Sequence, residues 1–438
     1  MLLALALGAI ALLLILISVL RLSPFLAFMI TAPAVGFAAG LAPQAVFSAL
    51  ETGIGKALGP VTAVLCIGAM LGKLIAGSGG AQRITEAMTR ALGMQRLPWA
   101  MMITGFVVGI PLFYNVGFVI LVPLLFTLQA ATRQPLLPMG IPLLAALSVT
   151  HGYLPPHPAP VYIADVFQAD LGLTLLYGFI VAVPAVLAGG PWFAQRLGRL
   201  QPRPDPALFQ AEPLPSDQLP PLGASVLTAL LPVVLIAMAA LVQGMLPEGH
   251  LLRQAMSLLG NPAVALLISL LLGLLLLGIR RGRTLSSLMQ EQGEAVKGIS
   301  PVLIIIAGAG ALKEMLDQAG VSQHLASLLD GSPLPPLVLG WAMAACIRVC
   351  IGSATIAGFT TAGILAPFVA ASGASPELMV LAIGAGSLFL SHVNDTGFWM
   401  FKEYFGLSVR DTLRSWSVME TLVSVVGLAG VLLLDLAV

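Results

Sequence analysis

Titratable and polar residues inside apolar stretches are the first candidates for chemistry in this sequence. Asp395 lies in SHVNDTGFW, between two apolar segments. An ionisable side chain at membrane depth is costly and is functional by default. We therefore predict that Asp395 carries a coupling proton, with capping of the following helix as its alternative role.

Histidine and asparagine side chains occur beside similar breaks in the apolar pattern. His151, His157 and His392 titrate near neutral pH and can donate to a carboxylate, although a purely structural hydrogen bond is the alternative for each. Asn115 and Asn394 both donate and accept, as binding of substrate hydroxyls requires, and Asn394 is also placed to cap a helix. All five are predicted substrate-binding residues.

A second group of polar residues interrupts the apolar stretch at CIGSATIAGFTTAG. Ser353, Thr355 and Thr360 supply hydroxyl groups there, and Arg348 lies just before the turn. Because guanidinium and carboxylate groups match in geometry, Arg348 is a candidate ligand for an anionic substrate. The sequence thus predicts a site for a small carboxylate.

The composition indicates where these residues lie. Of 438 residues, 58% are hydrophobic and only 9% are charged, whereas soluble domains carry about a quarter charged residues. A membrane-spanning helix needs about 20 apolar residues, so we predict an all-α polytopic membrane protein. The candidate spans are residues 2–20, 25–41, 57–77, 172–192, 223–247, 262–279, 298–318 and 416–436.

The net charge, the cysteine spacing and the position of the first arginine disfavour several functional classes. The net charge of +1 offers no basic surface for nucleic acid. The three cysteines match no zinc or redox spacing, so no metal or cofactor is expected. Arg21 follows the first apolar run instead of preceding it, which favours a retained helix over a cleaved signal.

The predicted elements break where the polar residues occur. Residues 97–132 are interrupted at Gly109–Gly117, and the arm of about 12 residues before the break reaches only ~18 Å, roughly half of the hydrocarbon core. Residues 334–371 repeat this pattern, so each segment is predicted to be a re-entrant hairpin. Broken helices at 141–160 and 381–399 follow the hairpins. Non-helical backbone at this depth is tolerated only when it is buried or lines a wet cavity.

The two halves of the chain resemble each other. Residues 67–80 align with 307–320 at an offset of 240, as in transporters built from repeats. We predict a first inverted repeat at 1–197, a cytoplasmic Pro-rich linker at 198–222 and a second inverted repeat at 223–438. Five crossings and one re-entrant hairpin per repeat, with both termini periplasmic, place 15 of the 20 Lys and Arg residues in the cytoplasm.

Four stretches, GIPLFYNVGFVILVPLLF, THGYLPPHPAP, GSATIAG and SHVNDTGFWMFKEYFGLSVRDTLRSW, together resemble the gluconate permease family. The resemblance implies a gluconate:proton symporter of the bacterial inner membrane, within the larger ion-transporter superfamily, whose members are often homodimers. Some relatives take D-serine or other small amino or hydroxy acids, and this chain has Tyr153 and Leu154 where the family pattern has leucine and valine. The family's functional positions fall here on Asn115, His151, His157, Ser353, Thr355, His392, Asn394 and Asp395.

The predicted function is therefore proton-coupled uptake of gluconate or a related sugar acid or small hydroxy-carboxylate. Symport of D-serine or another small amino or hydroxy acid, and sodium-coupled carboxylate transport, are alternatives. An intramembrane enzyme using Ser391, His392 and Asp395 is disfavoured, because adjacent residues on a helix point about 100° apart. A passive channel is disfavoured because the polar residues occur at isolated breaks and not along continuous stripes.

Overall fold

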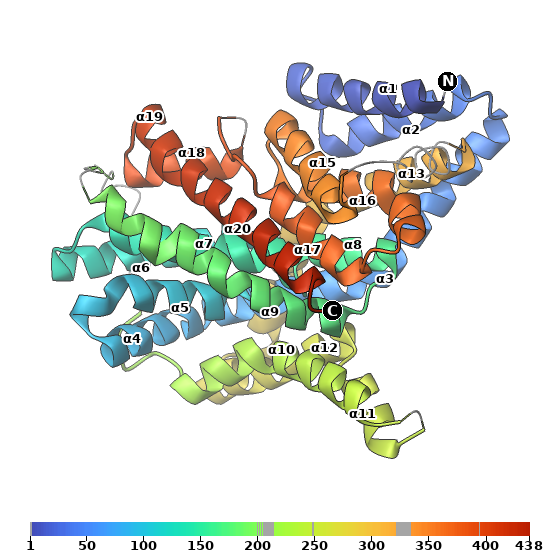
Figure 1. Cartoon of the computed structure of the whole chain (residues 1–438). Helices are drawn as coiled ribbons and strands as arrows, with labels where there is room; N and C mark the ends of the chain where they lie inside the picture. Colours follow the sequence, from blue (N-terminus) through green and yellow to red (C-terminus); the bar gives the residue numbers. More distant parts are fainter. Residues whose placement is uncertain are drawn as a thin grey trace.

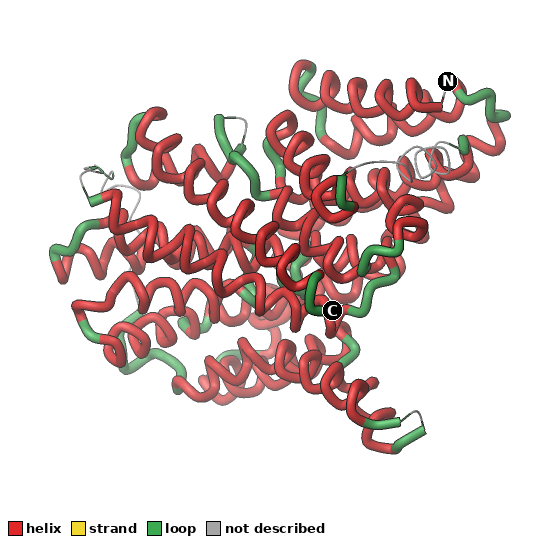
Figure 2. Tube along the Cα trace, viewed as in Figure 1, coloured by secondary structure: helices red, strands yellow, loops and turns green. Residues whose placement is uncertain are grey.

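The chain folds into helices joined by short loops (Figures 1 and 2). This computed structural model describes the chain from Leu2 to Val438 except residues 199, 201, 203, 205–213, 248, 321–333 and 394. Every regular element within those limits is a helix. The predicted all-α class is thus confirmed.

The first half, up to Leu197, contains five single α-helices and two pairs of α-helices that are separated by breaks. In order, its helices are α1 (Leu2–Leu14), α2 (Pro24–Ala38), α3 (Pro43–Gly77), α4 (Gly80–Leu92), α5 (Leu97–Gly109), α6 (Tyr114–Thr132), α7 (Leu136–Tyr153), α8 (Pro158–Phe167) and α9 (Leu171–Leu187). Wider turns continue α1 through Val19 and α9 through Trp192.

The second half has a similar order of long and broken helices. They are α10 (Leu222–Met245), α11 (Leu251–Leu259), α12 (Pro262–Gly273), α13 (Leu285–Gln318), α15 (Pro336–Ile351), α16 (Ala354–Ser372), α17 (Pro376–Ser387), α18 (Thr396–Phe405), α19 (Val409–Thr412) and α20 (Val418–Asp435). The inverted orientation of the halves and their predicted boundaries remain predictions. Residues 199, 201, 203 and 205–213 of the 198–222 linker lie outside the described residues, but Leu214 exchanges two hydrogen bonds with the Gln82 side chain of α4.

Within the described residues, seven helices are long and apolar enough to cross a membrane, or eight if the bent α3 is included. The chain is therefore a multi-pass membrane protein. Two predicted spans were too short, because α3 begins at Pro43 and not at 57, and α13 begins at Leu285 and not at 298. Lys56 and Lys297 had ended the apolar windows, whereas in the fold charged residues pair across the two helices, as Lys56 does with Glu314 at 3.0 Å.

The antiparallel pair α3 and α13 makes the most extensive helix contact among the described elements and runs obliquely through the molecule (Figure 1). The backbones meet at Gly53 and Gly310, where a Cβ on Gly53 would lie 2.4 Å from the Gly310 carbonyl oxygen. Small residues permit this close approach between membrane helices. The pair also packs against α2 and α12, whereas α5, α7, α9, α17 and α20 pack together in the central part of the molecule.

All four predicted helix breaks are present. The helices end before residues 110–113, 154–157, 352–353 and 388–395 and resume after them. Pro155 and Pro156 lack the N–H groups needed to continue α7, and Gly352, with φ of 83°, ends α15 in the left-handed conformation. Ser391 and His392 lie in the last break and not on a helix, because α17 ends at Ser387.

Candidate functional site

The four breaks border one cavity of about 280 Å³, near the lower end of the ~300–1,000 Å³ range of small-molecule pockets. Three of the breaks contribute residues to its wall, and the fourth, at 154–157, is followed directly by the lining residue Pro158. From the breaks and the helix starts next to them come Phe113, Tyr114, Pro158, Gly352, Ser353, Ala354, Thr355, Leu388, Asp395, Thr396 and Gly397. The sequence-based expectation that the breaks converge is confirmed.

Helices α6, α8, α16 and α18 all begin at this cavity. The first N–H groups of a helix have no partner within it, and the helix dipole makes that end positive. Ser353 caps α16 by accepting from the Ile356 N–H at 3.4 Å, and Asp395 caps α18 by accepting from the Gly397 N–H at 3.0 Å. An environment formed by several helix N-termini favours an anion.

Arg348 supplies a full positive charge at the cavity. Its Nη2 lies 2.5 Å from Asp395 Oδ2, and the two side chains are only 4% and 16% exposed. A guanidinium group has five N–H donors, and its Nε and Nη1 have no hydrogen-bond partner among the described residues. Arg348 can therefore hold Asp395 and still donate to a second carboxylate.

Asp395 is fixed by several donors. Besides Arg348 and the Gly397 N–H, the Ser391 hydroxyl donates to Oδ2. Trp416 Nε1 in turn donates to Ser391 Oγ at 2.7 Å. This network holds the break before α18 against the start of the last membrane helix.

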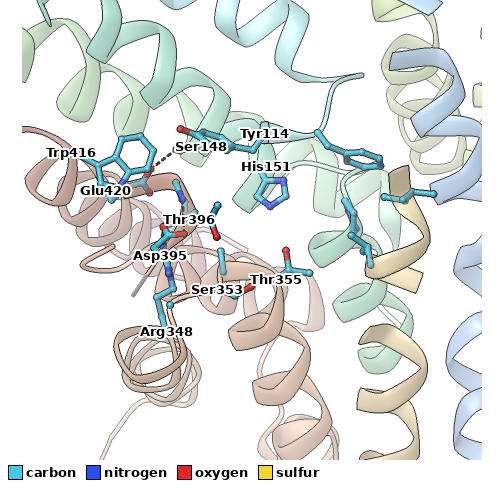
Figure 3. Close-up of a pocket in the computed structure, with 18 of the residues that line it drawn as sticks. Tyr114, Ser148, His151, Arg348, Ser353, Thr355, Asp395, Thr396, Trp416 and Glu420 are labelled. Atoms are coloured by element: carbon cyan, nitrogen blue, oxygen red, sulfur yellow. Dashed lines mark hydrogen bonds and ion pairs between the residues drawn. The ribbon is translucent and has the colours of Figure 1, made fainter. Parts of the chain in front are cut away.

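A buried carboxyl group belongs to the same wall of the cavity (Figure 3). Glu420 of α20 accepts a hydrogen bond from the Ser148 hydroxyl of α7, and its other oxygen has no partner among the described residues. Tyr114 and His151 also line the cavity, and the Tyr114 hydroxyl and His151 Nδ1 are buried without a hydrogen-bond partner among the described residues. Buried polar groups normally have partners, so their concentration here indicates a polar ligand.

Five of the predicted site residues line this cavity, namely His151, Arg348, Ser353, Thr355 and Asp395. Their roles in binding or proton transfer remain predictions. Asn115 lies in the first turn of α6, but its side chain is outside the described part of the chain, as is the whole of Asn394.

Three predicted residues lie elsewhere. The His157 ring is hydrogen-bonded to the Gly109 carbonyl at 2.9 Å and lies behind His151, with ring centroids 5.2 Å apart. The His392 ring is hydrogen-bonded to the Val349 carbonyl at 3.0 Å. Thr360 is buried within α16 and borders a separate narrow gap with Lys313. The two histidines connect neighbouring helix breaks and do not reach the cavity.

Sequence reasoning missed Tyr114, Ser148, Trp416 and Glu420. A signal was present for Glu420, since it is an acidic residue inside the apolar stretch 416–436. Nothing in the local sequence distinguishes Ser148 from other serines in apolar helices, because its partner lies 272 residues away.

A second cavity, of about 440 Å³, lies between α3, α8 and α13. Its lysines are already paired, Lys56 with Glu314 at 3.0 Å and Lys313 with Asp317 at 3.4 Å. The first cavity is therefore the better candidate for binding an anion, although it is smaller.

Broken helices around a polar cavity are typical of a membrane transporter, and the comparisons with known proteins identify the family. Residues 1–437 match the GntP family permeases, and the chain belongs to this family. Membership confirms the interpretation as a transporter and not an enzyme.

Relatives match over nearly their whole length. The Gnt-II system L-idonate transporter of Escherichia coli is 46% identical, with 98% of each chain covered, and the high-affinity gluconate transporter of the same organism is 44% identical, with 99% covered. The gluconate permease of Bacillus subtilis is 41% identical, with 99% of each chain covered.

Solved structures share the fold at low sequence identity. The YdaH transporter of Alcanivorax borkumensis superimposes with a TM-score of 0.67 at 16% identity, over 95% of this chain and 98% of that one. The MtrF efflux pump of Neisseria gonorrhoeae gives 0.65 at 15% identity, over 89% and 84%.

Proposed function

We propose that this permease takes up gluconate or a closely related sugar acid together with protons across the bacterial inner membrane. The observation that carries the proposal is Arg348, a buried guanidinium with unpartnered donors in a cavity bordered by four helix N-termini. The names of the relatives, gluconate and L-idonate transporters, agree with that chemistry.

In the proposed complex the substrate carboxylate accepts hydrogen bonds from Arg348 and the α16 N-terminus. The hydroxyl groups of a sugar acid then meet side chains that both donate and accept, Ser353 and Thr355 on one side and Tyr114 and His151 on the other (Figure 3). A hydroxyl-rich acid can satisfy more of the unpartnered groups than a short fatty acid of the same charge.

L-idonate is the second candidate substrate, since the relative with 46% identity is named for it. Gluconate and L-idonate differ only in the configuration of one hydroxyl carbon, so Arg348 serves both, and the hydroxyl-binding side chains must discriminate between them. We also propose that both termini lie in the periplasm and that the protein forms a homodimer.

Uptake into liposomes containing the purified protein tests the function. We expect labelled gluconate to accumulate when the outside is acidic, and a protonophore to abolish the accumulation. Competition by unlabelled L-idonate and D-serine ranks the substrates, and replacing the proton gradient with a sodium gradient tests the alternative coupling ion. Accumulation driven by sodium alone, or binding of D-serine but of no sugar acid, would contradict the proposal.

A further inference from the structure

The cavity contains two carboxyl groups with different surroundings. Asp395 accepts from a guanidinium, a hydroxyl and a backbone N–H. Glu420 is 2% exposed and accepts only from the Ser148 hydroxyl among the described residues. A proton added to Asp395 would compete with three donors and weaken the Arg348 ion pair, whereas Glu420 Oε2 can take a proton without displacing any partner.

The other titratable groups near Glu420 do not neutralise it. Arg348, Asp395, Tyr114 and His151 line the same cavity, and Arg348 is already paired with Asp395. The Tyr153 hydroxyl, from α7, donates to the Val423 carbonyl one turn further along α20. With His151 neutral, an ionised Glu420 is therefore a negative charge in excess within the cavity.

Substrate binding changes this balance. A substrate carboxylate next to Arg348 would place three negative charges beside one positive charge if Glu420 were ionised. Like charges in a poorly solvated site repel strongly, and an unpaired buried carboxylate is costly. One proton on Glu420 lowers the excess from two negative charges to one, so anion binding and proton binding favour each other.

We propose that Glu420, held by Ser148, is the proton-binding site that couples proton entry to sugar-acid transport. The proton arrives from water in the cavity, binds to Oε2 and returns to water on the cytoplasmic side after the substrate leaves. This inference rests on the proposed function and deepens it, and it assigns to Asp395 the role of positioning Arg348.

Proton uptake on substrate binding tests the proposal directly. Purified protein in weak buffer with a pH indicator should take up about one proton per bound gluconate. Glu420→Gln keeps the size of the side chain and mimics its neutral form, so it should still bind gluconate but take up almost no proton. In liposomes it should exchange gluconate, more slowly than the wild type, and fail to accumulate it in response to a pH gradient.

Control variants separate the outcomes. Glu403→Gln alters an exposed carboxyl group paired with Lys402 and should behave like the wild type. His151→Gln and Asp395→Asn should keep proton uptake for each gluconate bound. The inference is overturned if Glu420→Gln still takes up a proton when gluconate binds. It is also overturned if His151→Gln is the variant that loses this proton uptake. A wild-type protein that binds gluconate without proton uptake and ignores a pH gradient instead refutes the proton-coupled function itself.

Ser148→Ala provides a second test if Glu420→Gln does not fold. This variant keeps the carboxyl group and removes its only donor among the described residues. The pH at which gluconate affinity falls by half should move upward, because the carboxylate form loses a hydrogen bond. An unchanged pH profile in Ser148→Ala would count against the proposal.

Discussion

At the scale of single residues, the proposed binding of an anion depends on Arg348 and on Asp395, with which it is paired. The guanidinium is buried and paired with Asp395, yet its remaining N–H groups are directed to no partner in the described chain. Binding an anion there adds hydrogen bonds without first breaking the ion pair. Substrate affinity should therefore depend on donor geometry as well as on charge.

Arg348→Lys tests this dependence, since it keeps the charge and loses the planar set of donors. Loss of a hydrogen bond to a charged group costs about 1.5–3 kcal/mol, so the Kd for gluconate should rise ~10- to 150-fold. Titration calorimetry on purified protein measures this change. Arg410→Lys, at an exposed position, is the matched control, and equal affinities of the two variants would exclude Arg348 from binding.

Asp395→Asn distinguishes positioning from proton transfer. Asparagine caps helices as well as aspartate does, so α18 should persist while Arg348 loses its ion-pair partner. We expect uptake and exchange of gluconate to fall together, because a displaced Arg348 weakens binding in both assays. Loss of gradient-driven uptake with exchange intact would instead assign the proton to Asp395. Asp411→Asn, in the short helix α19, is the control.

At the scale of elements, close contacts between helix backbones hold the long helices together. The α3–α13 crossing depends on two facing glycines, Gly53 and Gly310, so there is no room for a side chain there. In the central group a Cβ on Gly384 of α17 would lie 2.2 Å from the Gly152 carbonyl oxygen of α7. These contacts fix the helices that present the broken segments.

Gly53→Ala should destabilise the protein, because the added methyl group would lie against the Gly310 carbonyl oxygen of α13. Overpacking of this kind costs about 1–3 kcal/mol, which should lower the melting temperature measured by tryptophan fluorescence. Gly55→Ala is a matched control in the same helix, where a Cβ meets nothing within 4 Å. Equal melting temperatures for the two variants would show that the crossing is not tightly packed.

At the scale of the whole molecule, the open feature is how the two halves are oriented in the membrane. The order of long and broken helices recurs in the two halves, and the distribution of basic residues favours opposite orientations. The inverted arrangement thus stays a proposal that needs its own test.

Two cysteine substitutions in a cysteine-free variant supply that test. Gln254 of α11 and Arg96, between α4 and α5, are both exposed. The proposed topology places Gln254→Cys in the periplasm and Arg96→Cys in the cytoplasm. A membrane-impermeant maleimide applied to intact spheroplasts should therefore label the first and not the second. The reverse pattern, or labelling of both, would contradict the topology.

The sequence by itself determined the features that depend on neighbouring residues. Apolar runs established the membrane class, and prolines and glycines such as Pro155, Pro156 and Gly352 established where the helices break, because missing N–H groups and left-handed backbone act locally. It also directed attention to Arg348 and Asp395 as charged groups within those breaks.

Only the tertiary structure decided which polar groups face one another. His151 lines the cavity while His157 and His392 are hydrogen-bonded to backbone carbonyls, a difference that sequence spacing does not encode. Glu420 joins the site because α20 packs against α7 beside Ser148, far away in the chain. Burial and hydrogen bonding depend on such long-range packing, and they separate the paired carboxylate of Asp395 from the nearly unpartnered carboxyl group of Glu420.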